Sequence, residues 1–517
     1  MLGIIQIENN LNGVNFMKII RILFFAILSI NLCYSANHEI ANKKADKRLI
    51  DAVQTGDIKL IHELLKDKSI DINASDEHGS TALIGASLKD NKEIIRLLID
   101  HHEINVNTKN NMGLTVLMVA SLRRQKEIVK LLLNHSADVN LRDNNGCTAL
   151  RLASMYGHKE EIELLLNCPD INVNIQDNNS NTALISASRH GHKEVVKLLL
   201  NHPDINVNIQ GNYGNTALIL ASRHGHKEVV ELLLNHPNIN VNIQNKDDET
   251  ALMWASYKGH KKIIKLLLNH PGINVNIQNN NGYTTLMYAS RFDLKEVVEL
   301  LLSHPKINVN LQTNTGRTAL IWASINGHKE TVKLLLNHHN INVNIQNNTD
   351  ENALIYASYN GHKETVKLLL NHHNINVNIQ NNYGSTALMY ASDRGYKEIV
   401  ELLLNHPDID VNIQNNTGEN ALILASRHGH KEVVELLEPY KNKYLPYRNK
   451  RIEELMNINE ALPNALTSMS FPKELVGIVQ QYAANDFMLF SQWVKYTEST
   501  SKESNLKNSR RNDCIIQ

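Results

Sequence analysis

One pattern of apolar and polar positions recurs along most of the chain with a period of 34 residues. In residues 182–215, TALISASRHGHKEVVKLLLNHPDINVNIQGNYGN, a run of small and aliphatic residues ends at Gly191, and a second run ends before Pro203. Apolar residues three and four apart in the second run predict a helix with one buried face. The pattern therefore predicts two short helices per unit, over residues 183–190 and 192–202, separated by a glycine turn.

The ends of this unit also carry local signals. Thr182 stands where its hydroxyl can cap the first helix by accepting a free backbone N–H, and Pro203 prevents the second helix from continuing. In residues 205–210 Ile and Val alternate with Asn and Gln, a period of two that predicts an extended arm. Residues 212–214, Asn-Tyr-Gly, predict a turn into the next unit.

The spacing of the capping position shows how far the pattern extends. Successive capping residues are 34 positions apart, with a single step of 33. They are Thr81, Thr115, Thr148, Thr182, Thr216, Thr250, Thr284, Thr318, Asn352, Thr386 and Asn420. A degenerate copy over residues 47–80 precedes them, which makes about twelve units over residues 47–438. One helix pair cannot bury its apolar face alone and needs its neighbours. We therefore predict an all-α repeat solenoid of helix-turn-helix units joined by short hairpin loops, and not the several globular domains that 517 residues would suggest.

These residues resemble the ankyrin repeat family, whose unit reads roughly G-x-T-P-L-H-x-A-A-x-x-G-H-x-x-V-V-x-L-L-L-x-x-G-A-D-V-N. The chain departs from that pattern where Ala183 replaces the usual Pro and Ser188 replaces the second Ala. Most units carry one extra residue, and one unit has Asp293-Leu294 in place of Gly-His. The resemblance implies short helices that line a concave face, with hairpin tips projecting beside them.

Charge and composition narrow the possible functions. With 53 Lys and Arg against 53 Asp and Glu, the chain lacks the basic excess that a nucleic-acid or anionic-membrane partner favours. No apolar run reaches the ~18–20 residues of a membrane-spanning helix. The four cysteines are too few and scattered for a disulfide-built domain or a zinc motif, and we expect Cys147 and Cys168 to be free thiols. We expect a monomer whose partner is a protein, with no cofactor.

The 25 histidines do not predict a metal site. Most follow the repeat in two series, after the turn glycine and after the second helix, so equivalent rings in adjacent units lie ~8–10 Å apart. Zinc needs its nitrogen ligands at about 2.0–2.1 Å from one ion. A collective response to acid below about pH 6.5 is one interpretation, and polar residues at helix ends are the other. No phosphate-binding glycine loop, G-x-S-x-G or H-E-x-x-H motif occurs, so we expect no enzyme.

Positions that differ between units are the ones a partner would recognise, because packing determines the rest. Aromatics make up only 5% of the chain, and nearly all those in residues 47–438 fall at these varying positions. Tyr, Trp and Arg dominate binding hot spots. The candidate partner-binding residues are Trp254, Tyr257, Tyr288, Arg291, Trp322, Tyr356, Tyr359, Tyr390 and Arg394 on the first helices, and Tyr213, Tyr283 and Tyr383 at the tips. The alternative is that these aromatics only pack between neighbouring units.

The N-terminal segment has the layout of a targeting signal. Residues 17–35, MKIIRILFFAILSINLCYS, combine a short basic start, an apolar stretch and small residues before a cut after Ser35. Within the leader 1–35 this predicts a signal peptide and a secreted or extracytoplasmic protein, whose translation starts at Met1 or Met17. The alternative is a cytosolic protein with an apolar N-terminus.

The C-terminal region departs from the repeat. We expect residues 439–496 to form a helical cap or module and residues 497–517, rich in Ser, Lys and Asn, to be disordered. Within it FPKELVGIVQQYAANDFMLFSQW weakly resembles the start of an F-box, whose helices recruit a ubiquitin-ligase adaptor. The alternative is a plain helical cap over the last repeat.

Together these patterns predict a non-catalytic, exported scaffold for protein–protein interaction, in its narrower form an effector of a host-associated microbe that reaches the host cell. Two alternatives stay open. One is the substrate-recognition subunit of a ubiquitin ligase, acting through the F-box-like segment. The other is a purely structural repeat protein.

Overall fold

The computed structural model describes residues 47–441 of the 517-residue chain. The chain divides after Asn382 into two compact parts. The signal peptide over residues 17–35, the F-box-like segment and the disordered tail that the sequence predicts all lie outside the described residues.

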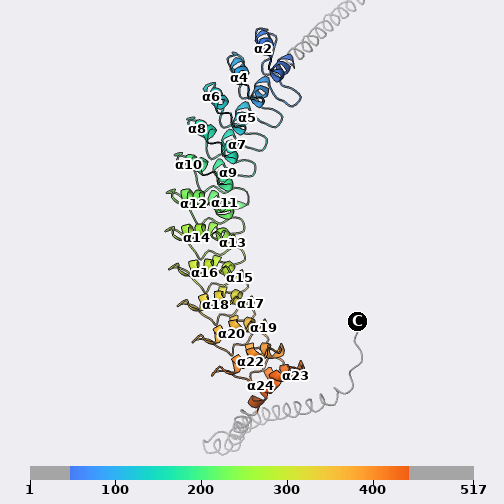
Figure 1. The fold of residues 1–517 in the computed structure, drawn as a ribbon, viewed down its shortest axis with the longest axis vertical. Helices are drawn as coiled ribbons and strands as arrows, with labels where there is room; N and C mark the ends of the chain where they lie inside the picture. The colour runs from blue at the N-terminus through green and yellow to red at the C-terminus, as the bar shows by residue number, and fades with distance from the viewer. Residues whose placement is uncertain (1–46, 442–517) are drawn as a thin grey trace, which may run out of the picture. The chain divides into compact units, whose positions relative to one another are not determined.

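The N-terminal part is an array of helix pairs (Figure 1). It opens with a helical stretch over residues 47–55 and α2 (Ile58–Leu64). The first helices of the following units are α3 (Ala82–Leu88), α5 (Val116–Leu122), α7 (Ala149–Tyr156), α9 (Ala183–His190), α11 (Ala217–His224), α13 (Ala251–Tyr257), α15 (Thr285–Arg291), α17 (Ala319–Ile325) and α19 (Ala353–Tyr359). The second helices are α4 (Lys92–Ile99), α6 (Lys126–Asn134), α8 (Lys159–Leu166), α10 (Lys193–Leu200), α12 (Lys227–Leu234), α14 (Lys261–Leu268), α16 (Lys295–Leu302), α18 (Lys329–Leu336) and α20 (Lys363–Leu370).

The two kinds of helix form two layers within this part. The helix α9 packs against α7 and α11, and α10 packs against α8 and α12 (Figure 1). The core between the layers is aliphatic: Leu184, Ala187, Val196 and Leu199 are at most 1% exposed. Between residues 47 and 441 the only β-type pairing is an isolated bridge from Ser75 to Thr81. The all-α repeat array predicted from the sequence is confirmed.

Local signals in the sequence produce the predicted helix ends. The Thr182 hydroxyl accepts a hydrogen bond from the Ile185 N–H at 3.2 Å and so caps α9. Gly191 ends that helix with a φ of 76°, a left-handed conformation that suits glycine. The helix α9 spans the predicted residues. The helix α10 is shorter than the predicted 192–202, because His192 is its N-cap residue and Asn201 its C-cap residue.

The arm after the second helix differs from the prediction. The alternation of burial is present, since Ile205 and Val207 are buried while Asn206 is exposed. However, the chain turns at Val207-Asn208 instead of running straight. The Asn206 side-chain oxygen accepts from the Asn208 N–H at 3.0 Å, and such a side-chain bond to the backbone two residues on replaces an extended conformation.

The C-terminal part contains two more units. Their helices are α21 (Ala387–Asp393), α22 (Lys397–Leu404), α23 (Ala421–Arg427) and α24 (Lys431–Lys441). As in the larger part, α21 packs against α23 and α22 packs against α24. The helix α24 continues through Pro439.

Candidate functional site

Asparagine and glutamine side chains tie the loops of neighbouring units together. The Asn208 Nδ2 group donates to the Asn238 carbonyl at 2.7 Å, and its Oδ1 atom accepts from the Asn240 N–H at 2.9 Å. The same two bonds recur at Asn73, Asn140, Asn174, Asn242, Asn276, Asn310 and Asn344. Gln210 Nε2 donates within its own loop and to the Gln244 carbonyl at 2.9 Å. The recurrent INVNIQ segment therefore holds the stack together.

The histidines after the turn glycine link consecutive first helices. The His226 Nε2 atom lies 3.0 Å from the Arg189 carbonyl oxygen in the preceding unit. The same contact to a carbonyl is made by His192, His260, His328, His362 and His430. Burial lowers the pKa of His192. Over residues 47–441 no group of three or more His, Cys, Asp or Glu side chains is arranged to hold a metal ion.

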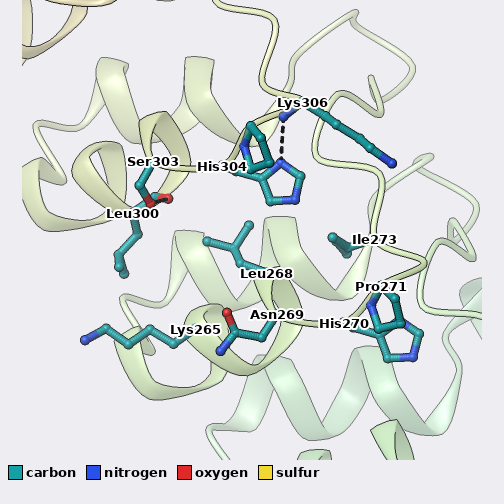
Figure 2. Close-up of a pocket in the computed structure, with 11 residues that line it drawn as sticks. Lys265, Leu268, Asn269, His270, Pro271, Ile273, Leu300, Ser303, His304 and Lys306 are labelled. Carbon is teal, nitrogen blue, oxygen red and sulfur yellow. Dashed lines mark hydrogen bonds between the residues drawn. The ribbon is translucent and has the colours of Figure 1, made fainter.

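The second histidine series lies at the outer ends of the second helices (Figure 2). The His304 Nδ1 atom accepts from the Lys306 N–H at 3.3 Å, and His270 does the same for Gly272 at 3.2 Å. Between these turns lies a hollow of about 340 Å³, lined among others by Leu268, Ile273 and Leu300. A similar hollow lies between α8 and α10, so the feature follows from the stacking and marks no special unit.

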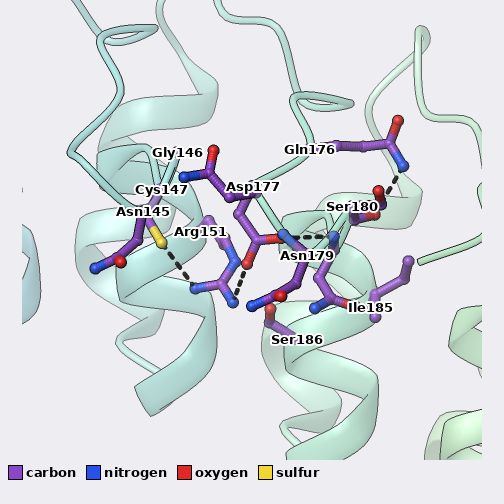
Figure 3. Close-up of polar contacts among 12 residues, drawn as sticks. Asn145, Gly146, Cys147, Arg151, Gln176, Asp177, Asn179, Ser180, Ile185 and Ser186 are labelled. Atoms are coloured by element: carbon purple, nitrogen blue, oxygen red, sulfur yellow. Dashed lines mark hydrogen bonds and ion pairs between the residues drawn. The ribbon is translucent and has the colours of Figure 1, made fainter. Parts of the chain in front are cut away.

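A buried ion pair joins two units where the sequence departs from the repeat (Figure 3). Arg151 takes the position that Ile185 has in the next unit, and its Nη2 atom lies 2.5 Å from Asp177 Oδ2. The Asp177 side chain is only 2% exposed. The Cys147 sulfur accepts from Arg151 Nη1 at 3.2 Å, and burial raises the pKa of the Cys147 thiol to about 11. Cys147 and Cys168 are free thiols, as predicted. The ion pair was not predicted from the sequence. Its signal was an Arg at a position of the repeat where the other units have Ile or Met.

The predicted partner-binding residues differ widely in exposure. In the N-terminal part Tyr213, Tyr257, Arg291 and Tyr359 are exposed, Trp254, Tyr283, Tyr288 and Tyr356 are half-buried, and Trp322 is buried. In the C-terminal part Tyr383 and Arg394 are exposed and Tyr390 is half-buried. The set therefore contains both accessible side chains and packing residues.

Trp322 is held between arginines. The Arg291 and Arg317 guanidinium carbons lie 4.6 and 4.9 Å from its ring centroid, which are cation–π distances. The Tyr283 ring lies 5.6 Å away, and only 7% of Trp322 is exposed. For this residue the alternative interpretation, packing between units, describes the structure.

Trp254 occupies the same position two units earlier but is less enclosed. The Arg223 guanidinium carbon lies 4.1 Å from its ring centroid, and the Tyr257 ring meets it edge-on at 6.1 Å. A hollow of about 260 Å³ lies beside it, lined by Glu249, Met253, Trp254, Tyr257 and Tyr288. Within the described residues the Trp254 Nε1 atom has no hydrogen-bond partner.

The polar groups of this hollow are desolvated. Burial raises the pKa of Glu249, and the nearby charge of Asp247 raises it further. Burial also raises the pKa of Tyr288, whose hydroxyl accepts from the Asn279 Nδ2 group at 3.0 Å. The hollow thus combines aromatic walls with a carboxylate, while lacking the paired acid, base and nucleophile of a catalytic site.

Comparison with known proteins identifies the family of the repeated units. The family model for ankyrin repeats, in three copies, matches residues 49–143, 102–177, 150–245, 237–313, 306–381 and 373–445. The chain belongs to the ankyrin repeat family. Among solved structures, the crystal structure of the ankyrin repeat protein EF0377 aligns at 28% identity with a TM-score of 0.36, over 39% of this chain and 98% of its own. None of the curated proteins matches this chain.

Ankyrin repeats are usually non-catalytic modules that bind other proteins. The matched ankyrin repeats extend over the helix pairs α3–α24 and the helices before them. The F-box-like resemblance of residues 471–493 has no support from these comparisons. No helix in the described range is long and apolar enough to cross a membrane.

Proposed function

We propose that this ankyrin repeat protein is a non-catalytic scaffold that binds another protein along its first helices. The surface runs from Trp254 to Tyr359 and includes the neighbouring loop tips. Tyr383, Tyr390 and Arg394 supply the same kinds of side chain in the C-terminal part.

One observation carries this proposal. The recurrent Asn, Gln and His side chains are already bonded to neighbouring units, so they serve the stack. The large apolar side chains left exposed are mostly aromatic and lie at varying positions: Tyr213 is 66% exposed, Tyr257 53% and Tyr359 38%. Exposed aromatics of this kind contribute strongly to binding when a partner covers them.

Affinity capture with the full chain tests the proposal. A variant with Tyr213→Ala, Tyr257→Ala and Tyr359→Ala should lose the captured partner while its melting temperature stays close to that of the parent. Trp322 is left unchanged because its removal would disturb packing. The matched control carries Lys193→Ala, Glu228→Ala and Lys367→Ala, all exposed on second helices. Equal capture by the tyrosine variant and the control would refute the proposed surface.

We further propose that the protein is exported, on the pattern of residues 17–35. Expression of the full chain in a secreting host should give a mature protein that begins at Ala36. Ser35→Arg should block this cleavage, because the cut requires a small residue at that position. An uncleaved protein retained in the cell would contradict export. The ubiquitin-ligase alternative rests on residues outside the described part, and nothing in the described part favours it.

A further inference from the structure

The residue just before the N-cap has a recurring place in this array. It lies between two side chains at the fourth position after the N-cap, one in its own unit and one in the next. Tyr283 shows the arrangement, since its ring lies 4.9 Å from Tyr288 in its own unit and 5.6 Å from Trp322 in the next. The side chain before the N-cap therefore fills the gap between neighbouring aromatics.

In the following gap an arginine takes this place. The Arg317 guanidinium carbon lies 4.9 Å from the Trp322 ring and 5.5 Å from the Tyr356 ring. Its Nη2 atom donates to the Tyr356 hydroxyl at 3.2 Å. The Tyr356 hydroxyl also accepts from Asn347 Nδ2 at 2.9 Å. A planar guanidinium is thus a natural occupant of a gap between two aromatic rings in this stack.

The gap between Trp254 and Tyr288 also lies between two aromatic rings, but no arginine fills it. The residue before the N-cap is Glu249, and here the gap is a hollow of about 260 Å³. The Tyr288 hydroxyl accepts from Asn279 Nδ2 at 3.0 Å, as Tyr356 does from Asn347. This gap therefore keeps the aromatic walls and the hydroxyl, and it carries a carboxylate where the other gap carries its own guanidinium.

The chemistry of this hollow selects a cation. Glu249 is half-buried. Burial and the Asp247 charge raise the pKa of its carboxyl, whereas the Asn245 side chain and the Arg223 charge only partly offset them. A desolvated carboxylate of this kind gains from a charged donor. Two cations of this region lie on aromatic rings: Arg223 is 4.1 Å from the Trp254 centroid and Lys258 is 5.1 Å from that of Tyr257. In the same tip, the two carboxylates of Asp247 and Asp248 exceed the single positive charge of Lys246.

We propose that the hollow between Trp254 and Tyr288 binds an arginine side chain of the protein partner. The guest guanidinium stacks between the two rings as Arg317 does in its own gap, pairs with Glu249 and donates to the Tyr288 hydroxyl. Arginine is favoured over lysine because only its planar group both stacks and pairs in a fixed geometry. This inference rests on the proposed function and names the chemistry of its central contact.

Short peptides test it on the full chain, with tryptophan fluorescence as the readout. The probes are Ac-Gly-Arg-Gly-amide, its lysine counterpart and its citrulline counterpart, which keeps the planar shape without the charge. The arginine peptide should give a saturable change at millimolar concentration, the lysine peptide a weaker one and the citrulline peptide none. Glu249→Gln should weaken arginine binding about tenfold, as expected for loss of a charged hydrogen bond.

Two further variants make the test specific. Glu249→Arg should fill the hollow from within, as Arg317 fills its gap, and abolish binding of the arginine peptide without lowering the melting temperature. Glu351→Gln is the matched control, because Glu351 also precedes an N-cap but its carboxylate already accepts from the Thr349 hydroxyl at 2.8 Å. It should leave binding unchanged.

Several results would overturn the proposal. One is the absence of a saturable fluorescence change with the arginine peptide. Another is binding of the citrulline peptide as tight as that of the arginine peptide. A third is an unaltered affinity for the arginine peptide after Glu249→Gln. If Glu249→Arg misfolds, Glu249→Gln still decides. A captured protein partner that binds Glu249→Arg as well as the parent chain defeats this inference alone, whereas capture that ignores the exposed tyrosines defeats the proposed function.

Discussion

The imidazole of His226 occupies the space that Gly191 leaves open by having no side chain. An ideal Cβ on Gly191 would lie 2.5 Å from the His226 Nδ1 atom. The same ring donates to the Arg189 carbonyl at 3.0 Å. The glycine thus serves the left-handed turn of its own unit and the docking of the next unit's histidine.

Gly191→Ala should therefore lower the stability by more than the strain of a left-handed alanine alone would. Gly259→Ala is the matched control, because Gly259 has a similar φ of 70° but a Cβ added there would meet nothing within 4 Å. The control should cost about 1–2 kcal/mol for the left-handed backbone, and Gly191→Ala should cost clearly more. Urea unfolding measures both. Equal losses would show that the ring moves aside freely.

Acid should weaken the array through the outer histidines. His338 and His372 each use Nδ1 to accept a backbone N–H at 3.3 Å, which the protonated ring cannot do. Burial, and then the neighbouring His339 and His373, lower the pKa of these two groups from 6.5. The unfolded chain thus binds protons more readily, and their contribution is present above pH 6.5 and falls as the pH drops below it.

Urea unfolding at neutral pH and in mild acid measures this effect. The double variant His338→Gln, His372→Gln should show a flatter loss of stability on acidification than the parent chain. The control is His78→Gln, on an exposed loop residue, which should keep the parent's slope. An unchanged slope in the double variant would exclude these rings as the source.

The buried serines whose hydroxyls have no hydrogen-bond partner should be dispensable. The Ser188 and Ser222 side chains are 0% exposed, and within the described structure their hydroxyls have no hydrogen-bond partner. Ser188→Ala and Ser222→Ala should each stabilise the fold by about 1 kcal/mol, because they remove an unsatisfied polar group. Ser87→Ala should instead destabilise it, since the Ser87 hydroxyl donates to Gln125 Oε1 at 2.7 Å. Chemical denaturation of the three variants checks these opposite signs.

The ion pair between Arg151 and Asp177 should behave as a coupled unit. Arg151→Ile leaves the Asp177 carboxylate buried without its cation and should cost about 3–5 kcal/mol. The double variant Arg151→Ile, Asp177→Asn copies Ile185 and Asn245 at the equivalent positions of other units, and should recover most of that loss. A double-mutant cycle in urea gives the coupling energy. Additive losses would show that the pair contributes no specific interaction.

Individual residues show how far sequence reasoning reaches in the candidate site. The varying positions and the aromatic residues on them were visible in the sequence, and so was the spacing of three residues that puts Trp254 beside Tyr257. Which aromatics are accessible was not. Trp322 and Trp254 hold the same position in the repeat. Tyr283 and Arg317 enclose Trp322, whereas Trp254 lies beside the hollow that Glu249 helps to line.

The sequence by itself determined the features that depend on neighbours along the chain. The period, the helix pairs, the Thr182 cap, the Gly191 turn and the aliphatic core all follow from signals within a few residues of one another. The tertiary structure decided everything that joins residues of different units. The offset between stacked units determines the hydrogen bonds of Asn208 to residues 238 and 240 and the position of the His226 ring against Gly191. It also determines which side chain fills each aromatic gap. That offset is a property of packing, and no single unit contains it.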